Sequence, residues 1–581
     1  MLQQITDLAS HAGPYTTYGQ LMAGALVLGL VLYVCFHEQE LHPDIPAFGI
    51  DDKGWMRIEK SRKRYTERGL QIAGEAIQRI ATDVGVKIFL PARYAEEIKN
   101  NKNMSFKKAI AEDSFSYYNG LEPLRLLSSD HNIVQRVTRQ NITQTLSSWH
   151  LSKPYLILHS CNNADPSQDL VTDDISEEAG LALEEILGDK EGKNEKRLPT
   201  FRSSHEIVID ISILNADWTT VTLKPLILDL VARLSSRLFV GTELCRNKEW
   251  LHLAKNYTLD SFDAARALRR KPLALRSLLI WFLPEWHRVR QDVRDARRLL
   301  APVINARLER NRLADEKGVP RPRTKDTIQW FYDAFPTHAT TRKIADAQLA
   351  LSVVAIHTTT ELLTGVLLDL AQKEEFITEL RQDIVSILTK ANESAIALSG
   401  AYDGAVEKNG KVAWKKNTLY QMKLLDSALK ETQRLHVRDI ASMRRIAESE
   451  VKLSDGTVIP KGAFTWVTLE AYRNPERYPD PEVYNPRRFR DMRSQPGQEN
   501  KWQLVSTSAD HLGFGHGEHA CPGRFFASNE VKIALVHLLM KYDWKLPQGR
   551  RPDDVVKGGT ETGVDGQAGI MLRRRKEEMQ L

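Results

Sequence analysis

Apolar residues recur along this chain with the spacing of helices more often than with the alternation of strands. Helical patterns cover residues 57–82, 222–239, 289–311, 340–373, 374–391, 418–435 and 527–541. Shorter strand-like pieces lie between turns, as in residues 451–469, where Asp455-Gly456 and Pro460 mark the bends. The pattern predicts a mainly α protein with small β-sheets.

An apolar run near the N-terminus has a different character. Residues 18–36 carry no charge, and 19 residues rising about 1.5 Å each span roughly the core of a bilayer. A cleaved signal peptide or a buried soluble helix are the alternatives, but residues 1–17 contain no Lys or Arg. We expect a lumenal tail at 1–17, a transmembrane anchor at 18–36, a proline-containing linker at 37–50 and a body at 51–581.

Charge and cysteine usage narrow the class of protein. The net charge of +6 comes without a polybasic tract, so no nucleic-acid partner is expected. The cysteines Cys35, Cys161, Cys245 and Cys521 are far apart, which argues against a zinc ribbon or a disulfide framework. Residues 165–197 hold 11 acids against 4 bases, and we expect a solvated acidic insertion there, around a short helix at 176–187.

The helix predicted at 340–373 has a polar interruption in an apolar setting. It is apolar on nearly every face before His357, Thr358, Thr359 and Thr360 arrive together. Buried polar groups need partners, because each one left unpaired costs about 1–3 kcal/mol. Two interpretations stay open at this point, a hydrogen-bonded structural kink or a polar notch beside a reactive centre.

A cysteine stands on a glycine-rich loop just before the last long helix. In the loop 511–523, Cys521 is followed by Pro522 and Gly523, so its sulfur would lie near a helix N-terminus that favours a thiolate. Gly515 and Gly517 would let the backbone approach a flat group closely. The sulfur could be a haem-iron ligand, an inert buried thiol, a nucleophile or a zinc ligand.

This loop resembles the haem-binding loop of the cytochrome P-450 superfamily. Phe514, Gly517, His519, Cys521 and Gly523 match that family's aromatic, glycine, basic, cysteine and glycine positions. The basic position usually holds Arg, and His519 is a variant associated with fungal members. The resemblance implies the P-450 fold and haem b (iron protoporphyrin IX) with Cys521 as the protein ligand of the iron.

Other family motifs occur in the expected order. Glu431 and Arg434 match the Glu-x-x-Arg helix and Arg488 the Pro-x-Arg-Phe segment, which implies a buried charge network of these three. Arg445 stands where many members contact a haem propionate. No Trp-x-x-x-Arg was found in the early helices, so a second propionate contact is unassigned.

The polar notch resembles the oxygen-activating segment of the same family. Thr358, followed by Thr359, falls on the threonine that helps deliver protons, but His357 replaces the usual acid. Because histidine titrates near pH 6.5, we expect that His357 could relay protons at neutral pH. Segments 231–260 and 326–335 are similar to fungal monooxygenases related to ent-kaurene oxidases and indole-diterpene oxidases.

The resemblance implies a membrane-bound haem-thiolate monooxygenase. It would oxidise a lipophilic terpenoid or other polycyclic secondary metabolite, using O2 and NADPH-derived electrons from a separate flavoprotein reductase. The resemblance implies a single-pass protein of the endoplasmic reticulum membrane, and the basic residues after the anchor predict that the catalytic body lies in the cytosol. Residues 268–286 are either a helix connection or a loop entering the membrane surface. The alternative functions are an O2-independent isomerase or dehydratase and a non-catalytic haem sensor.

Overall fold

The computed structural model describes most of the body. These residues are 77–82, 85–129, 131–143, 170–188, 218–272, 275–322, 324–335, 339–399, 414, 416–559, 561–579 and 581, with the single residues Met22, Ala25, Gly29, Ile45 and Tyr65. The predicted anchor and linker therefore lie almost wholly outside the described residues. Within the described part, only α15 (Thr341–Leu370) is long and apolar enough to cross a membrane, and 67% of its most apolar window is buried in the protein.

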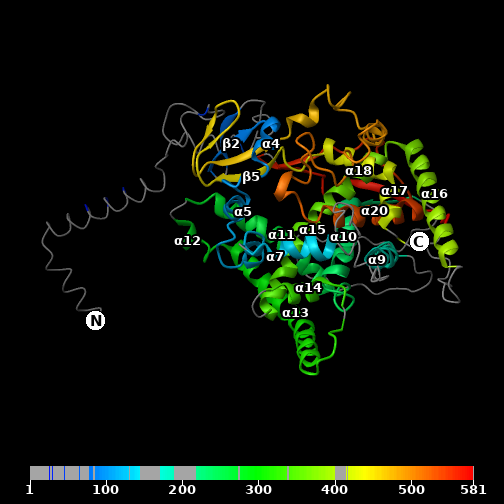
Figure 1. Cartoon of the computed structure of the whole chain (residues 1–581), viewed down its shortest axis with the longest axis horizontal. Helices are drawn as coiled ribbons and strands as arrows, with labels where there is room; N and C mark the ends of the chain where they lie inside the picture. The colour runs from blue at the N-terminus through cyan, green and yellow to red at the C-terminus, as the bar shows by residue number, and fades with distance from the viewer. Residues whose placement is uncertain are drawn as a thin grey trace, which may run out of the picture.

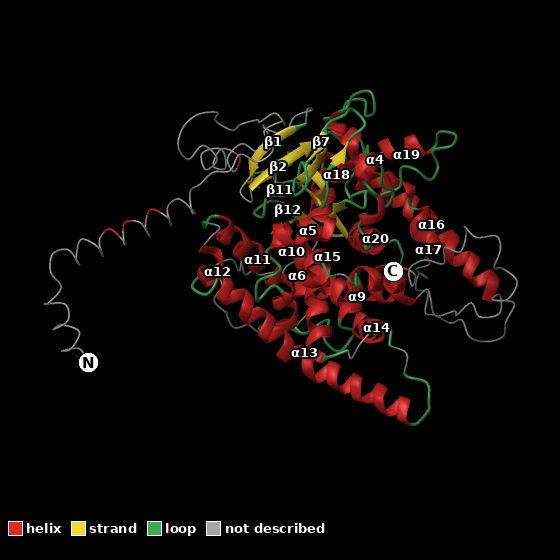
Figure 2. Ribbon diagram, turned by 60° about the vertical axis from the view of Figure 1, so that its left-hand side comes forward, coloured by secondary structure: helices red, strands yellow, loops and turns green. Residues whose placement is uncertain are grey.

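Helices make up most of the described chain, and the sheet that contains β1, β2 and β5 lies at one end of it (Figures 1 and 2). The longer helices are α5 (Phe106–Ser114), α9 (Leu170–Ile186), α10 (Leu223–Phe239), α11 (Lys248–Arg269), α13 (Pro284–Glu316), α14 (Thr327–Ala334), α16 (Glu374–Ser399), α18 (Lys423–Leu435) and α20 (Arg524–Lys541). Short helices are α4 (Ala95–Ile98), α6 (Glu122–Leu127), α7 (Ile133–Val137), α12 (Arg276–Leu279), α17 (Lys416–Gln421) and α19 (Arg488–Arg493). The predicted fold class, mainly α with small sheets, is confirmed.

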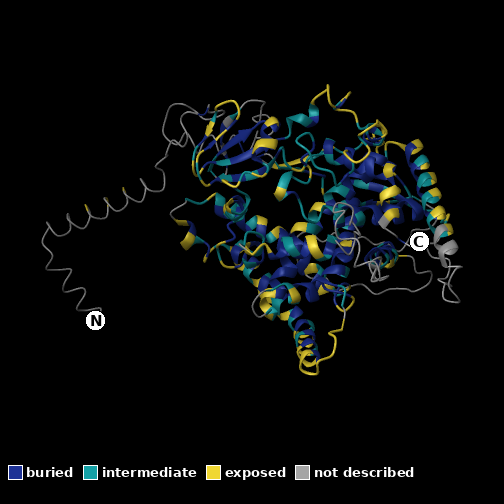
Figure 3. Cartoon of the chain, in the orientation of Figure 1, coloured by how far each residue is buried: buried dark blue, intermediate teal, exposed yellow. Residues whose placement is uncertain are grey.

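The core is built around α15. This helix packs against α10, α11, α13, α18 and α20, and Figure 3 shows buried residues concentrated around this centre. Its side chains are buried on almost every face because neighbours surround it, as its lack of a polar stripe predicts. The polar notch at 357–360 therefore lies on the central helix of the core.

The strands form four small sheets. The largest has the order β1 (Gln78–Thr82), β2 (Gly85–Leu90), β8 (Phe464–Thr468), β5 (Ala441–Ala447), β3 (Met104–Ser105). A three-stranded sheet joins β4 (Thr219–Thr222), β12 (Gly569–Arg574) and β9 (Tyr542–Lys545), and two hairpins pair β6 (Val451–Lys452) with β7 (Val458–Ile459) and β10 (Val555–Gly558) with β11 (Glu561–Gly563). Because β2 and β8 run parallel, the large sheet brings N-terminal and C-terminal segments together.

Two helix predictions need correction. The pattern at 57–82 ends in strand β1, because residues 78–82 pair antiparallel with β2. Most of residues 57–77 lie outside the described set. The helix predicted at 418–435 is two helices, α17 and α18, which are separated at Met422.

The solvated acidic insertion is wrong where the structure describes it. Helix α9 packs against α10 and α20, and its apolar side chains are buried in the main core. Its acids are not all exposed, since Glu178 is buried between Arg233 and Arg246 at 2.6 and 2.7 Å. Residues 165–169 and 189–197 lie outside the described set.

Candidate active site

The loop that carries Cys521 is held in a tight, hydrogen-bonded conformation. The Cys521 N–H donates to the Phe514 carbonyl at 2.8 Å, and the Ala520 N–H donates to the Gly517 carbonyl at 3.0 Å. Gly517 has φ +78°, and a Cβ there would lie 2.8 Å from the carbonyl oxygen of Lys99. Glycine at 517 is thus required by the turn and by close packing against the chain itself.

The sulfur of Cys521 lies at the start of α20, as predicted. Burial raises the pKa of the Cys521 thiol, while hydrogen bonds from the backbone of Gly523 and Arg524 and the Arg524 charge act to lower it. Burial outweighs the helix terminus, so the helix alone does not make a thiolate here. A bound metal would deprotonate the thiol outright.

Arg445 is a buried cation that is not neutralised. Its side chain lies on β5 with 2% exposure. Its Nη1 donates to the Arg444 carbonyl at 2.8 Å, but among the described residues no acceptor reaches its Nε. Burial lowers its pKa to about 10, and Glu518 is the acid that opposes this. An unpaired buried guanidinium costs several kcal/mol unless an anion joins it.

Further basic side chains lie near Arg445. The rings of His519 and Phe106 are stacked, with their centroids 5.2 Å apart. The Arg445 guanidinium lies 5.4 Å from the centroid of the Phe106 ring. Burial lowers the pKa of His519, and the charges of Arg445, Arg139 and Lys107 lower it further. The cluster is therefore suited to a ligand with carboxylate groups, as haem has.

Arg139 was missed from the sequence. It lies in the π-helical turn Thr138–Ile142, and its guanidinium donates to the Glu518 carbonyl at 2.7 Å, next to His519. The motif sought in the early helices was Trp-x-x-x-Arg, and the chain lacks this tryptophan. The remaining signal, an arginine on a helix, is too common to single out Arg139.

The residues present fit a haem held through one cysteine. Among the described residues no group of three His, Cys, Asp or Glu side chains is placed to hold a metal ion. This disfavours the zinc interpretation of Cys521, because zinc needs three or four protein ligands. A porphyrin supplies the other ligands of its iron, so one sulfur suffices.

Three charged residues are brought together behind this loop. Glu431 on α18 accepts from Arg434 Nε at 2.8 Å and from Arg488 Nε at 2.9 Å. Backbone carbonyls of Tyr472 and Pro479 take further bonds from the arginines, at 2.7 and 2.5 Å. Every member is nearly fully buried and paired, so the network rigidly joins α18 to the segment around α19.

The notch on α15 has one exposed face. Thr358 is exposed, and its hydroxyl donates to the carbonyls of Val354 and Ala355 at 2.8 and 3.1 Å. Val354 is 44% exposed, although it lies in the middle of a core helix. Thr359 and Thr360 are buried, and Thr360 donates to the Ile356 carbonyl at 2.8 Å. Val354 and Thr358 therefore form an exposed stripe on this otherwise buried helix.

His357 does not behave as expected. Its Nε2 lies 2.9 Å from the carbonyl oxygen of Lys255 on α11, and burial lowers its pKa to about 4. The expected titration near pH 6.5 is therefore wrong. At neutral pH the ring is uncharged and acts as a fixed hydrogen-bond donor between two helices.

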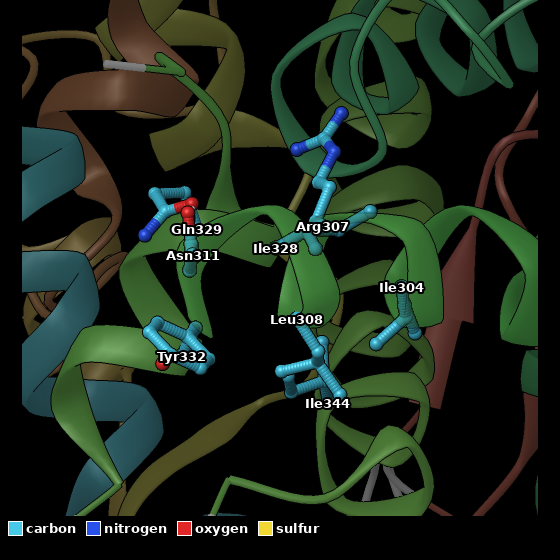
Figure 4. Close-up of a pocket in the computed structure, with 8 residues that line it drawn as sticks. All are labelled: Ile304, Arg307, Leu308, Asn311, Ile328, Gln329, Tyr332 and Ile344. Atoms are coloured by element: carbon cyan, nitrogen blue, oxygen red, sulfur yellow. Dashed lines mark hydrogen bonds between the residues drawn. The ribbon is translucent and has the colours of Figure 1, made fainter. Parts of the chain in front are cut away.

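A crevice elsewhere in the protein contains none of these residues. Figure 4 shows it where α13, α14 and the start of α15 meet, lined by Ile304, Arg307, Leu308, Asn311, Ile328, Gln329, Tyr332 and Ile344. It is too narrow for a water molecule. The candidate residues Cys521, Arg445 and Thr358 all lie outside this crevice.

Comparison with known proteins decides the family. Residues 214–564 match the sequence profile of the cytochrome P-450 family, which is more than half of the chain. The chain belongs to this family. It is 38% identical over 562 residues to cytochrome P-450 monooxygenase hepE of Aspergillus oryzae, covering 95% of this P-450 and 89% of the relative.

Two further relatives agree. Cytochrome P-450 monooxygenase adrA of Penicillium rubens is 37% identical, over 90% of each chain, and cytochrome P-450 monooxygenase 1 of Gibberella fujikuroi is 36% identical, over 86% of this P-450 and 98% of the relative. Retinoic acid-bound cyanobacterial CYP120A1 shares the fold with a TM-score of 0.55 at 16% identity, covering 91% of this P-450 and 100% of the other chain. This P-450 is a haem-thiolate monooxygenase.

Proposed function

We propose that this P-450 is an anchored enzyme of secondary metabolism that oxidises a lipophilic terpenoid or related polycycle. Its electrons would come from NADPH through a separate flavoprotein reductase. The observation that carries the proposed site is the buried guanidinium of Arg445, which has no described partner at its Nε and lies beside the cysteine loop. An anionic cofactor bound beside this loop would neutralise it.

Residues of the cysteine loop and of β5 would hold the haem. Cys521 would be the iron ligand, held by the loop that includes Phe514, Gly517 and Gly523. Arg445 and His519 would bind the carboxylates of the haem. When bound, haem supplies the activation of dioxygen that side chains cannot perform.

Thr358 is suited to hold and move a proton in this site. Its hydroxyl hydrogen is bonded to carbonyls of its own helix, so its oxygen lone pairs remain free to accept a hydrogen bond from water at this exposed position. Val354, on the same face, would contact substrate. Thr359 is buried against the core and would support Thr358 by packing.

The membrane role has support from an exposed apolar patch. Residues Leu278, Trp281 and Phe282 are 59%, 52% and 71% exposed, in the connection between α11 and α13. The predicted alternatives for 268–286 were a helix connection with core contacts and a loop in the membrane surface. Exposed aromatic residues with Arg270 and Lys271 nearby favour the second, in which lipophilic substrate enters from the bilayer.

Expression with a reductase tests the proposal. Microsomes from a host that makes candidate terpenoids should convert one of them to a product heavier by oxygen, and only when NADPH and O2 are present. Conversion without either would contradict the electron supply and support the isomerase or dehydratase alternative. Oxidation of hydrophilic compounds alone would contradict the substrate class.

A further inference from the structure

A carboxylate lies one turn beyond Thr358, on the same face of α15. Glu361 is three residues after Thr358 and four after His357, and such pairs on a helix have Cβ atoms about 5–6 Å apart. Position 357, where the family carries an acid, holds a histidine here. Glu361 is therefore the acid of α15 that follows the notch most closely.

Glu361 is connected to the surface by two lysines. Its Oε1 lies 2.5 Å from Lys224 Nζ on α10 and 2.8 Å from Lys557 Nζ on β10, and its Oε2 accepts from the Val564 N–H at 3.0 Å. The carboxylate side chain is 14% exposed and the Lys557 side chain 38%. A charged chain thus runs from solvent at Lys557 to the interior at Glu361.

The protonation states suit a relay. Burial would raise the pKa of Glu361, but the charges of Lys224 and Lys557 outweigh it and lower that pKa below its ordinary value. Burial lowers the pKa of Lys224, against the attraction of Glu361. The carboxylate is therefore ionised at neutral pH, and it would hold a proton only in passing between the two lysine side chains and water.

His357 is excluded from this task by its own contacts. It is a neutral donor to the Lys255 carbonyl, and the charged groups that act on it are Arg438, Glu361 and Lys224. Two of those three are cations, which oppose its protonation. The proton supply therefore needs a different group on this face of α15.

We propose that Glu361, supplied through Lys557 and Lys224, delivers protons toward Thr358 and so replaces the acid that position 357 lacks. A proton leaves an ammonium group for the Glu361 carboxylate and passes to a water bonded to the Thr358 hydroxyl. The lysine regains a proton from bulk water and no electrons move. Glu361 acts through Thr358 and is a positioning residue, so the inference rests on the proposed role of Thr358.

A purely structural clamp is the competing explanation. The ion pairs join the β10–β11 hairpin to α15, and the hairpin is close-packed there, since a Cβ on Gly563 would lie 2.5 Å from Lys557 Nζ. A clamp predicts weaker substrate binding and lower thermal stability on its loss. A clamp predicts no change in the amounts of product and peroxide formed per NADPH. It also predicts no change in how these amounts depend on pH.

The test uses the full chain in membranes with its reductase. The variants are Glu361→Gln, which keeps the shape and an acceptor for Val564, and Lys557→Met, with Glu309→Gln as control because Glu309 is an exposed acid paired with Arg312 on α13. Product and peroxide formed per NADPH are measured from pH 6 to 9 in H2O and D2O. Reductive methylation of Lys557 is followed by mass spectrometry in the resting protein.

We expect Glu361→Gln to lower product per NADPH at least about tenfold, with more peroxide and a larger solvent isotope effect. Lys557→Met should show a smaller change in the same direction and the control none. Lys557 should be methylated faster in Glu361→Gln, because the ion pair that holds its amino group is lost.

Two outcomes distinguish failure of the Glu361 relay from failure of the proposed role of Thr358. If Glu361→Gln alters methylation and stability but leaves coupling and its pH profile unchanged, the clamp is the whole role and the relay is overturned. If Thr358→Ala stays fully coupled, the proposed role of Thr358 fails first, whatever Glu361 does.

Discussion

His357 bonds α15 to α11: its Nε2 lies 2.9 Å from the carbonyl oxygen of Lys255. Because a carbonyl can only accept, Nε2 carries the hydrogen. The bond is therefore made by the neutral ring, and it ties α11 to α15. A proton on the other ring nitrogen would add a buried charge between Arg438 and Lys224.

This contact gives stability a defined pH dependence. The pKa of His357 is about 4 in the folded state against 6.5 as its ordinary value, so between these values the unfolded chain binds a proton that the folded chain does not. Stability is unaffected above pH 6.5 and falls as pH drops toward 4, by about 3 kcal/mol in total. In urea unfolding, His357→Asn should remove that part of the acid dependence. An identical acid dependence in both proteins would contradict the assignment.

Arg445 should matter for cofactor binding and not for the fold. We expect Arg445→Met to leave the haem-free chain as stable as the parent, or more so, because a buried unpaired charge is removed. Haem affinity should fall about 10- to 100-fold, as the loss of a charged hydrogen bond predicts. Arg550→Met, at an exposed site near the C-terminus, is the control. Lower haem-free stability with unchanged haem affinity would show that the guanidinium has a structural partner instead.

Glu431→Gln should destabilise the whole body. The substitution leaves Arg434 and Arg488 buried with a neutral partner, at a cost of about 3–5 kcal/mol. Urea unfolding of purified protein measures the loss. Glu379→Gln is the matched control, because Glu379 is 37% exposed where it meets Arg487 and an exposed pair contributes under about 1 kcal/mol. Equal losses in the two variants would argue against a rigid network.

The exposed apolar patch should bind lipid. In a form of the protein that lacks residues 1–36, Trp281→Ser with Phe282→Ser should weaken partitioning onto phospholipid vesicles at least about tenfold, because two large apolar side chains no longer enter the bilayer. Sedimentation with vesicles measures this directly. Leu313→Ser, an exposed apolar position on α13, serves as control. Unchanged partitioning would place 268–286 away from the membrane.

The sequence predicted best what lies in short, contiguous motifs. The loop of Cys521, the Glu431–Arg434 turn and the apolar helix around Thr358 can each be recognised because their residues are neighbours in the chain. Contacts between distant segments could not be predicted. Glu178 looked like a solvated acid, yet Arg233 and Arg246 bury it, and His357 looked titratable until α11 covered it.

Local pattern also failed where pairing decides the conformation. Residues 78–82 fit a helical pattern, but the backbone partners supplied by β2 make them a strand. Arg139 has no motif around it and is found only through its bond to the Glu518 carbonyl. In both cases the deciding partner is a backbone group, which side-chain patterns do not reveal.

The central claim is that Cys521 binds the haem iron. The most direct test is the carbon-monoxide difference spectrum of the reduced protein, compared between Cys521→Ala and Cys245→Ala. Cys245 is fully buried, and burial raises the pKa of its thiol to about 11, so it is a matched inert cysteine. The account predicts that the spectrum of thiolate-bound haem is lost in Cys521→Ala and kept in Cys245→Ala. Its persistence in Cys521→Ala would contradict the account.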